Sequence, residues 1–325
     1  MPTIVPVKFV STPNTIIQAI QMVLQHTDQS SLSLSEVMGY TSHAFRINVR
    51  PKSIETDSPY TIHGSEAVRR GFRLLGYHTQ GICPPVKTIT PEMLTDIIHI
   101  IRRSLDRGFP VVAWNMFALE FGVIYGYDDS RKVLLAMDNS FDGSIPYDQL
   151  PNRRILSLSV MDQPIEVGRQ ERLKETVEAI LDHAYSRDGL AWDQARDGLR
   201  GYEAWIEAFN GGRISNKGNA FNLHILADAR QHAAAFLELL SKQWDDGTVF
   251  GTNVSHLAQQ AAVHYAVVLD NLRELTMMYP YPLSTRGANP RQKENVPRSI
   301  ELLSRAREAE ELGIAALNEM YERLR

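Results

Sequence analysis

The spacing of apolar residues changes near Val160, and this change limits the folds that the chain can adopt. Before Val160, short runs rich in Val, Ile, Phe and Tyr alternate with stretches of helical periodicity, which is typical of an α+β fold. After the polar linker MDQPIEVGRQ, almost every apolar residue falls on a helical period. We therefore expect two domains: an α+β domain with an antiparallel sheet over residues 1–162, and an all-α helical bundle over residues 163–325.

The composition of the 325-residue chain is that of an ordinary globular protein, with 43% hydrophobic and 22% charged residues. Its net charge of -4 gives no electrostatic reason to bind nucleic acid or an anionic membrane surface, and we expect neither partner. Because Cys83 is the single cysteine, an internal disulfide is excluded and a reducing compartment is indicated. No apolar run is long enough to span a bilayer, and the first residues lack the features of a signal peptide, which predicts a cytoplasmic protein.

Apolar periodicity and turn residues predict the individual elements of the first domain. The first long helix is expected to begin at Asn14 or Thr15, because the turn sequence STPN precedes a helical pattern. Apolar runs between Gly108 and Ser140 predict a meander of three strands, the last two joined by a turn over residues 126–132. The expected strands are 3–10, 45–49, 110–114, 121–125, 133–137 and 154–160, and the expected helices are 16–26, 34–40, 64–75 and 90–103.

Helices separated by short loops are expected throughout the second domain, which predicts a bundle. The charged run SRAREAEE on the final helix predicts a solvated face. We consider a homo-oligomer through this helical domain. The expected helices are 173–184, 191–209, 219–242, 253–278 and 296–324.

Two carboxylates lie at the ends of the meander strands. Glu120 directly precedes the apolar run 121–125, and Asp138 directly follows the run 133–137. Buried strands carry apolar residues, so a charge at a strand end is either solvated or functional. We expect the start of the first long helix and these two strand ends to converge on one pocket.

Four segments carry a resemblance to a known family: Asn14-Thr15 at the start of a helix, EVMGYTSHAFRI, GFPVVAW…EFGVIYGYDD, and the later MDN. In this order they resemble a papain-like, C39-peptidase-like α+β domain. More narrowly, they resemble the N-terminal domain of the butirosin biosynthesis protein H family, in which a helical domain follows. The resemblance covers roughly the first half of the chain by motif and the second half by helical content.

That resemblance implies a cysteine nucleophile at the start of the first helix, a histidine base at the start of a central strand, and an Asp or Asn that orients the base. A helix N-terminus lowers the pKa of a thiol, and the imidazole then carries the proton. In this chain the nucleophile position holds Thr15, or Asn14 if the register shifts by one residue, and the base position holds Glu120. Asp138, followed by Asn139, matches the orienting position.

These replacements leave three functions open. The first is a non-thiol relative of cysteine acyltransferases and peptidases that binds a small acyl- or amino-acid-derived molecule in an interdomain cleft, with a role in specialised biosynthesis. The second is an active transferase or hydrolase that uses Thr15 or a water activated by Glu120, although a threonine hydroxyl is a poor nucleophile without a strong base beside it. The third is a structural or partner-binding protein whose cleft is closed. We expect no cofactor, and whether the chain is an enzyme stays open.

Two arginines lie in apolar surroundings, where a guanidinium needs a carboxylate or carbonyl groups. Arg46, in the stretch HAFRINV, either forms an internal ion pair or contacts a ligand, and His43 is either a structural residue or part of the cleft wall. Arg230 falls within an apolar helical stripe. It pairs either with a bundle carboxylate such as Glu203 or Glu207, or with an anionic group of a ligand.

Histidines at helical spacing are a further feature of the second domain. His224, Asp228 and His232 project from one face of a helix, and His256 and His264 project from one face of the next. Two such faces opposed could bind a metal. The apolar stripe of the first helix is centred away from His224 and Asp228, however, and the Glu-x-x-His pattern of di-iron proteins is absent. We therefore expect no metal.

Overall fold

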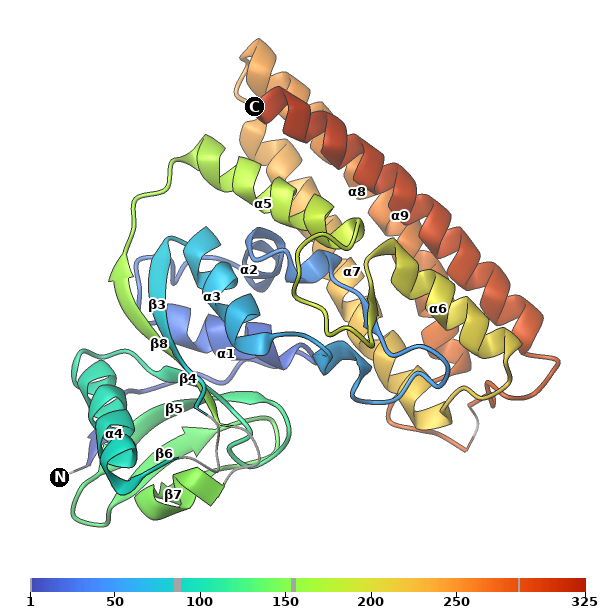
Figure 1. The fold of residues 1–325 in the computed structure, drawn as a ribbon. Coiled ribbons are helices and arrows are strands. Elements are labelled where there is room, and N and C mark those ends of the chain that lie inside the picture. The colour runs from blue at the N-terminus through green and yellow to red at the C-terminus, as the bar shows by residue number, and fades with distance from the viewer. Residues whose placement is uncertain (1, 85–88, 153–155, 286) are drawn as a thin grey trace. The chain divides into compact units, whose positions relative to one another are not determined.

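The computed structural model describes residues 2–84, 89–152, 156–285 and 287–325. The fold is α+β, as the sequence predicts, with a seven-stranded antiparallel sheet and a helical C-terminal region (Figure 1). The chain forms two compact units. The sheet unit comprises Met1–Ser33 and Gly64–Val167, and the helical unit comprises Leu34–His63 and Gly168–Arg325.

The segment Leu34–His63 belongs to the helical unit, whereas the expected boundary at residue 162 places it in the first domain. The reason is aromatic packing against α7 (Asn216–Trp244). The ring of Phe236 on this helix lies 5.0 Å from the ring of Tyr40, centroid to centroid. A side chain at Gly39 would overlap with the same Phe236 ring, so glycine permits the close approach. Such long-range packing leaves no trace in local periodicity.

The strands of the sheet unit are arranged in the order β3-β8-β4-β5-β6-β7, and β1 pairs with β5. The predicted meander is confirmed: β4, β5 and β6 are antiparallel neighbours, with Val112 opposite Val123 and Ile124 opposite Ala136. The strands are β1 (Thr3–Ile4), β3 (Tyr77–Ile82), β4 (Val111–Trp114), β5 (Phe121–Asp128), β6 (Val133–Met137), β7 (Asp142–Pro146) and β8 (Ser157–Pro164).

Other predicted strands differ in extent. The expected strand 3–10 contains only the short β1. The expected strand 45–49 contains only β2 (Asn48–Val49), because its first residue, Phe45, is the last residue of a 3-10 turn. Neither β3 nor β7 is predicted, since the sequences YHTQGI and DGSIP lack an apolar run. The expected strand 154–160 overlaps β8, and its residues 154 and 155 lie outside the described part of the chain.

The helices of the sheet unit match the predicted ones closely. In α4, Ile97, Ile101 and Leu105 are spaced one helical turn apart and share a buried cluster with Val111 and Ile124 of the sheet. The first helix, α1, is buried along almost its whole length and packs against β4 and β5. These helices are α1 (Thr15–Leu24), α3 (Gly64–Leu74) and α4 (Pro91–Asp106).

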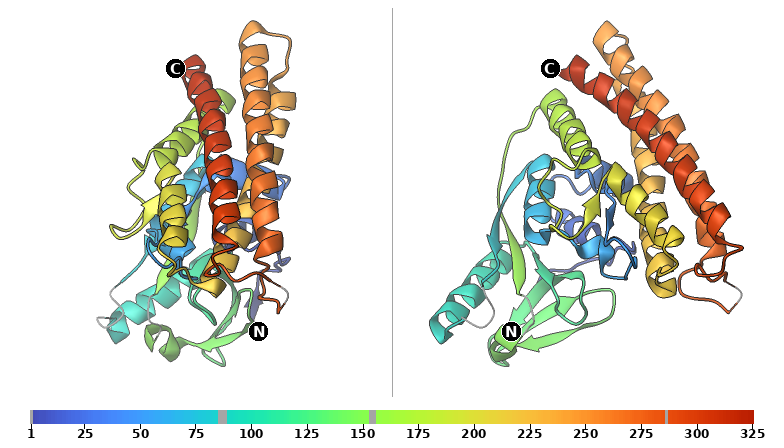
Figure 2. Two further views of the ribbon diagram at one scale, coloured as in Figure 1. Left: turned by 90° about the vertical axis from the view of Figure 1, so that its right-hand side faces the viewer. Right: turned by 45° about the vertical axis from the view of Figure 1, so that its right-hand side comes forward.

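The helical unit confirms the predicted bundle, and α7, α8 and α9 are long helices that pack side by side (Figures 1 and 2). The expected helix 191–209 begins only at Leu199, because the residues before it form β9 (Arg196–Asp197), which pairs with β2. None of the described helices has the length and apolar character needed to cross a membrane. The helices are α2 (Leu34–Tyr40), α5 (Arg169–Ala184), α6 (Leu199–Asn210), α7, α8 (Val249–Met278) and α9 (Val296–Leu324).

Candidate functional site

The start of α1 and the start of β5 lie against each other in the sheet unit. Asn14 caps α1, since its Oδ1 accepts a hydrogen bond from the N–H of Ile17 at 3.4 Å. Thr15, the first helical residue, accepts a hydrogen bond at Oγ1 from the N–H of Phe121 at 3.2 Å. Phe121 directly follows Glu120. The structure therefore brings the predicted nucleophile position next to the predicted base position.

Asp138 holds together the two loops that surround this point. One carboxylate oxygen accepts hydrogen bonds from the N–H groups of Phe117 and Ala118 at 3.1 and 3.0 Å. The other oxygen accepts from the N–H groups of Ser140 and Phe141 at 2.8 and 3.0 Å. Asp138 is only 3% exposed. Because a carboxylate has about four acceptor positions, these contacts occupy it fully, and its role is to position the loops.

Glu120 lies at the end of the first of these loops and is half-buried. Its Oε1 accepts a hydrogen bond from the Ser140 hydroxyl at 3.0 Å, and Asn139 donates to the same carboxylate. Burial raises the pKa of Glu120, and the negative charge of Asp138 adds to this effect, while the donors from Ser140 and Asn139 oppose it. The site therefore contains a carboxyl group that holds its charge less readily than an ordinary glutamate.

Large apolar side chains lie on the same two loops as Glu120. Leu119 is 57% exposed and Phe141 is 59% exposed, so large apolar groups are in contact with solvent beside a carboxylate. The ring of Phe117 lies 5.1 Å from that of Phe141 in an edge-to-face arrangement. These loops therefore offer a ligand both an apolar surface and a partly buried carboxylate.

The geometry limits which of these residues can react. Thr15 is only 2% exposed, and its oxygen already accepts a backbone hydrogen bond, so it is poorly placed to attack a substrate. Asp138 orients loops rather than a base. Asn14 has a structural role as the helix cap, and Asn139 is exposed and bound to Glu120. Glu120 is thus the predicted site residue best placed to meet a ligand in this unit.

His43 and Arg46 lie in the helical unit, where both have structural partners. Arg46 forms an ion pair with Asp188, with 2.8 Å between Nη1 and Oδ2, as one of the predicted alternatives requires. The Nδ1–H of His43 donates to the carbonyl oxygen of Thr41 at 3.1 Å. Burial and the nearby Arg46 charge lower the pKa of His43 to about 3, so its ring is neutral.

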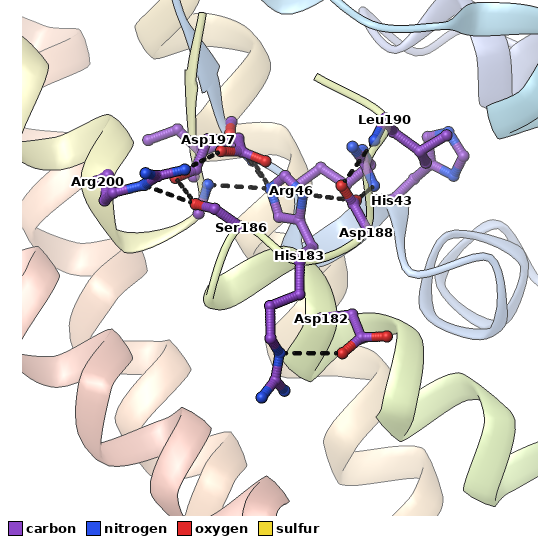
Figure 3. Close-up of polar contacts among 12 residues, drawn as sticks. His43, Arg46, Asp182, His183, Ser186, Asp188, Leu190, Asp197 and Arg200 are labelled. Atoms are coloured by element: carbon purple, nitrogen blue, oxygen red, sulfur yellow. Dashed lines mark hydrogen bonds and ion pairs between the residues drawn. The ribbon is translucent and has the colours of Figure 1, made fainter. Parts of the chain in front are cut away.

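His183 completes this cluster and was not singled out from the sequence. The N–H groups of Ile47 and Gly198 approach its Nε2 at 3.0 and 3.3 Å. The Ile47 carbonyl oxygen also lies 3.2 Å from Nε2, but two donors against one acceptor favour an unprotonated Nε2. Nε2 is therefore the acceptor, and Nδ1–H donates to Asp188 at 3.1 Å (Figure 3). Burial, followed by the charge of Arg46, lowers the pKa of His183 and keeps it neutral.

Three side chains of this cluster have the spacing of metal ligands, but arginines already pair with both of its carboxylates. Within the described residues, ligand atoms of His183, Asp188 and Asp197 lie within 4.8 Å of one another. Arg46 already pairs with Asp188, and Arg200 pairs with Asp197 at 3.3 Å (Figure 3). Both ring nitrogens of His183 are also engaged. The donor set therefore fits a structural network better than a bound cation.

Arg230 is fully buried and forms four hydrogen bonds within the helical unit. It donates to both carboxylate oxygens of Glu310, at 2.8 and 2.6 Å, and to the carbonyl oxygens of Ala44 and Arg46 at 2.9 and 3.1 Å. An ion pair is thus found, but the expected partners are wrong, because Glu310 on α9 faces Arg230 and Glu203 pairs elsewhere with Arg307. These four hydrogen bonds engage all three nitrogens of the guanidinium within the protein, which favours the ion pair over a ligand contact.

The histidine faces of α7 and α8 form local contacts. His232 bonds Ser35 at 2.9 Å and lies 3.8 Å from Asp228, and His256 bonds Gln260 at 3.0 Å. Over the part of the chain that the structure describes, these faces do not combine into a group with metal-ligand spacing.

Comparison with known proteins adds no assignment: no protein-family model matches this sequence, and no curated protein is significantly similar to it. The resemblance to papain-like domains therefore stays a prediction, and the functional proposal rests on the geometry of the sheet unit.

Proposed function

We propose that the sheet unit binds a small acyl- or amino-acid-derived molecule at Glu120, as a non-thiol relative of cysteine acyltransferases and peptidases. The observation that carries this proposal is the half-buried Glu120 carboxylate, which lies beside exposed Leu119 and Phe141. The carboxylate recognises an ammonium or amide N–H group, and the apolar side chains accept the hydrophobic part of the ligand.

The existing contacts leave capacity for a ligand. Ser140 donates to Glu120 from its hydroxyl, and Asn139 donates from its side chain and its backbone, whereas a carboxylate has about four acceptor positions. The loops do not need ligand contacts to hold their conformation, because Asp138 binds them from the inside. Such a pre-formed site reduces the entropy cost of binding.

The test uses L-phenylalaninamide, which joins an ammonium group to an apolar ring, and calorimetric titration of the full chain. We expect measurable binding that is weakened about tenfold to a hundredfold by Glu120→Gln, the range expected for a charge-assisted hydrogen bond. Glu166→Gln is the matched control, since Glu166 is an exposed glutamate of the same unit. Equal affinity in wild type and Glu120→Gln would refute the proposal.

A second candidate is hydrolysis by a water molecule that Glu120 activates, and the raised pKa of Glu120 favours it because a stronger base accepts a proton more readily. The probe is the p-nitrophenyl ester of N-acetyl-L-phenylalanine, whose cleavage adds water across the acyl–oxygen bond. Turnover that is present in the wild type and lost in Glu120→Gln would support this candidate.

A further inference from the structure

An exposed line of residues runs along α8, the second of the long helices in the helical unit. These residues are spaced seven apart, so they follow a line along the helix surface that drifts by only about 20° per repeat: Val249, His256, Val263, Asp270 and Met277. Val249 is 82% exposed and Met277 is 75% exposed, the highest values for large hydrophobic residues in the described chain, and Val263 is 55% exposed. About eight turns of helix thus carry, at their two ends and their middle, apolar groups that the described chain leaves exposed.

A hollow of about 390 Å³ lies beside the middle of this line, between α8 and α9. Val263 and His264 line it from α8, and Leu312, Ala315 and Glu319 line it from α9. The two helices run side by side here (Figure 2) and approach closely at Gly313, where an added Cβ would lie 2.8 Å from the Tyr265 ring. Leu312 is itself 55% exposed, so the hollow has an apolar rim.

The order of residues along the line is symmetric about Val263. His256 and Asp270 each lie seven residues from Val263, on opposite sides, and Val249 and Met277 each lie fourteen residues from it. If a second α8 is laid antiparallel on the first with the twofold axis at Val263, Val249 meets the partner's Met277. His256 meets the partner's Asp270, and Val263 meets the partner's Val263.

We propose that α8 is the contact surface of a twofold homodimer, in which the α8 helices of two copies pack antiparallel with Val263 at the axis. Isologous interfaces require this kind of self-complementary surface. Apolar residues then face apolar residues, and each imidazole faces a carboxylate, twice per dimer. A parallel arrangement would instead place like groups together, His256 on the partner's His256 and Asp270 on the partner's Asp270, which costs free energy.

The first test measures the molar mass of the full chain against concentration by sedimentation equilibrium. We expect a concentration-dependent dimer in the wild type, and a dissociation constant about tenfold higher in His256→Glu, which places a second negative charge against the partner's Asp270. The double variant His256→Glu with Asp270→Arg creates two opposite-charge pairs and is expected to restore the dimer. A wild-type monomer at every concentration, or no rescue by the double variant, would overturn the proposal, since a parallel dimer is not rescued.

A covalent test locates the axis. Cys83→Ser removes the only native thiol, and Val263→Cys in that background places two thiols at the axis, so mild oxidation is expected to give a disulfide-linked dimer. Arg305→Cys is the control, because Arg305 is exposed on α9 and lies outside the α8 line. Equal cross-linking of both cysteine variants would show random collision and would contradict the proposed axis.

Discussion

Glu120 carries a charge that its surroundings disfavour, since burial and Asp138 together raise its pKa above the ordinary value. The folded state therefore binds a proton at Glu120 more tightly than the unfolded state does, and ionisation at neutral pH lowers the free energy of unfolding. Ligand recognition offers a reason for a carboxylate at such a position, because sites that bind ligands often contain groups that cost stability.

This argument predicts the pH dependence of stability in a variant. Glu120→Gln removes the disfavoured charge, so we expect its Tm at pH 7 to lie about one to three degrees above that of the wild type. The difference should shrink as the pH falls and vanish below about 4, because wild-type Glu120 is then protonated in the unfolded state as well as in the folded state. Thermal unfolding followed by circular dichroism at both pH values measures this difference in Tm, with Glu166→Gln as the control. A variant that is less stable at pH 7 would show that the ionised carboxylate supports the loops.

Asp138 has the opposite role, because its carboxylate stabilises the loops through four backbone N–H groups. In Asp138→Asn one oxygen becomes an NH₂ group, which leaves two of these N–H groups without an acceptor. We expect a loss of about 2–4 kcal/mol in the free energy of unfolding. Denaturant unfolding measures it, and Asp96→Asn on the exposed surface of α4 is the control. A loss equal to that of the control would contradict the structural role.

At the scale of elements, the sequence predicts those features that depend on local periodicity. The runs Val111–Trp114 and Val133–Met137 are strands because their apolar residues are buried in the sheet, and the long helices of the second half follow from their repeating apolar stripes. β3 and β7 are not predictable in this way, since mixed polar sequences form strands only when a neighbouring strand supplies hydrogen bonds.

The candidate site shows the same division between local and long-range information. Glu120 and Asp138 are found from the sequence because charges at the ends of apolar runs are conspicuous. Ser140 and His183 are not found from the sequence, because their partners are distant in the chain. Ser140 binds Glu120, which lies 20 residues away, and His183 binds Ile47, which lies 136 residues away. The only local signal for His183 is Asp188 five residues later, which alone does not distinguish a buried pair from two surface residues.

At the scale of the whole molecule, the helical unit is built from two separate stretches of chain. Leu34–His63 supplies the ring of Phe45, which packs 5.0 Å from Tyr265, and the ion pair of Arg46 with Asp188. It also supplies backbone carbonyl acceptors for the buried Arg230. Without this segment, the buried guanidinium of Arg230 loses two carbonyl acceptors and the buried carboxylate of Asp188 loses its arginine partner, which is destabilising.

A fragment cut at the sequence-based domain boundary should therefore be incomplete. We expect residues 163–325 alone to unfold at least about ten degrees below the helical transition of the full chain, and a synthetic peptide of residues 34–63, added in trans, to raise that temperature in a concentration-dependent way. The control peptide carries Phe45→Ala and Arg46→Ala, and it should raise the temperature much less because it lacks the aromatic contact with Tyr265 and the ion pair with Asp188. If the fragment unfolds at the temperature of the full chain and ignores both peptides, the bundle folds independently and the segment is only attached to it.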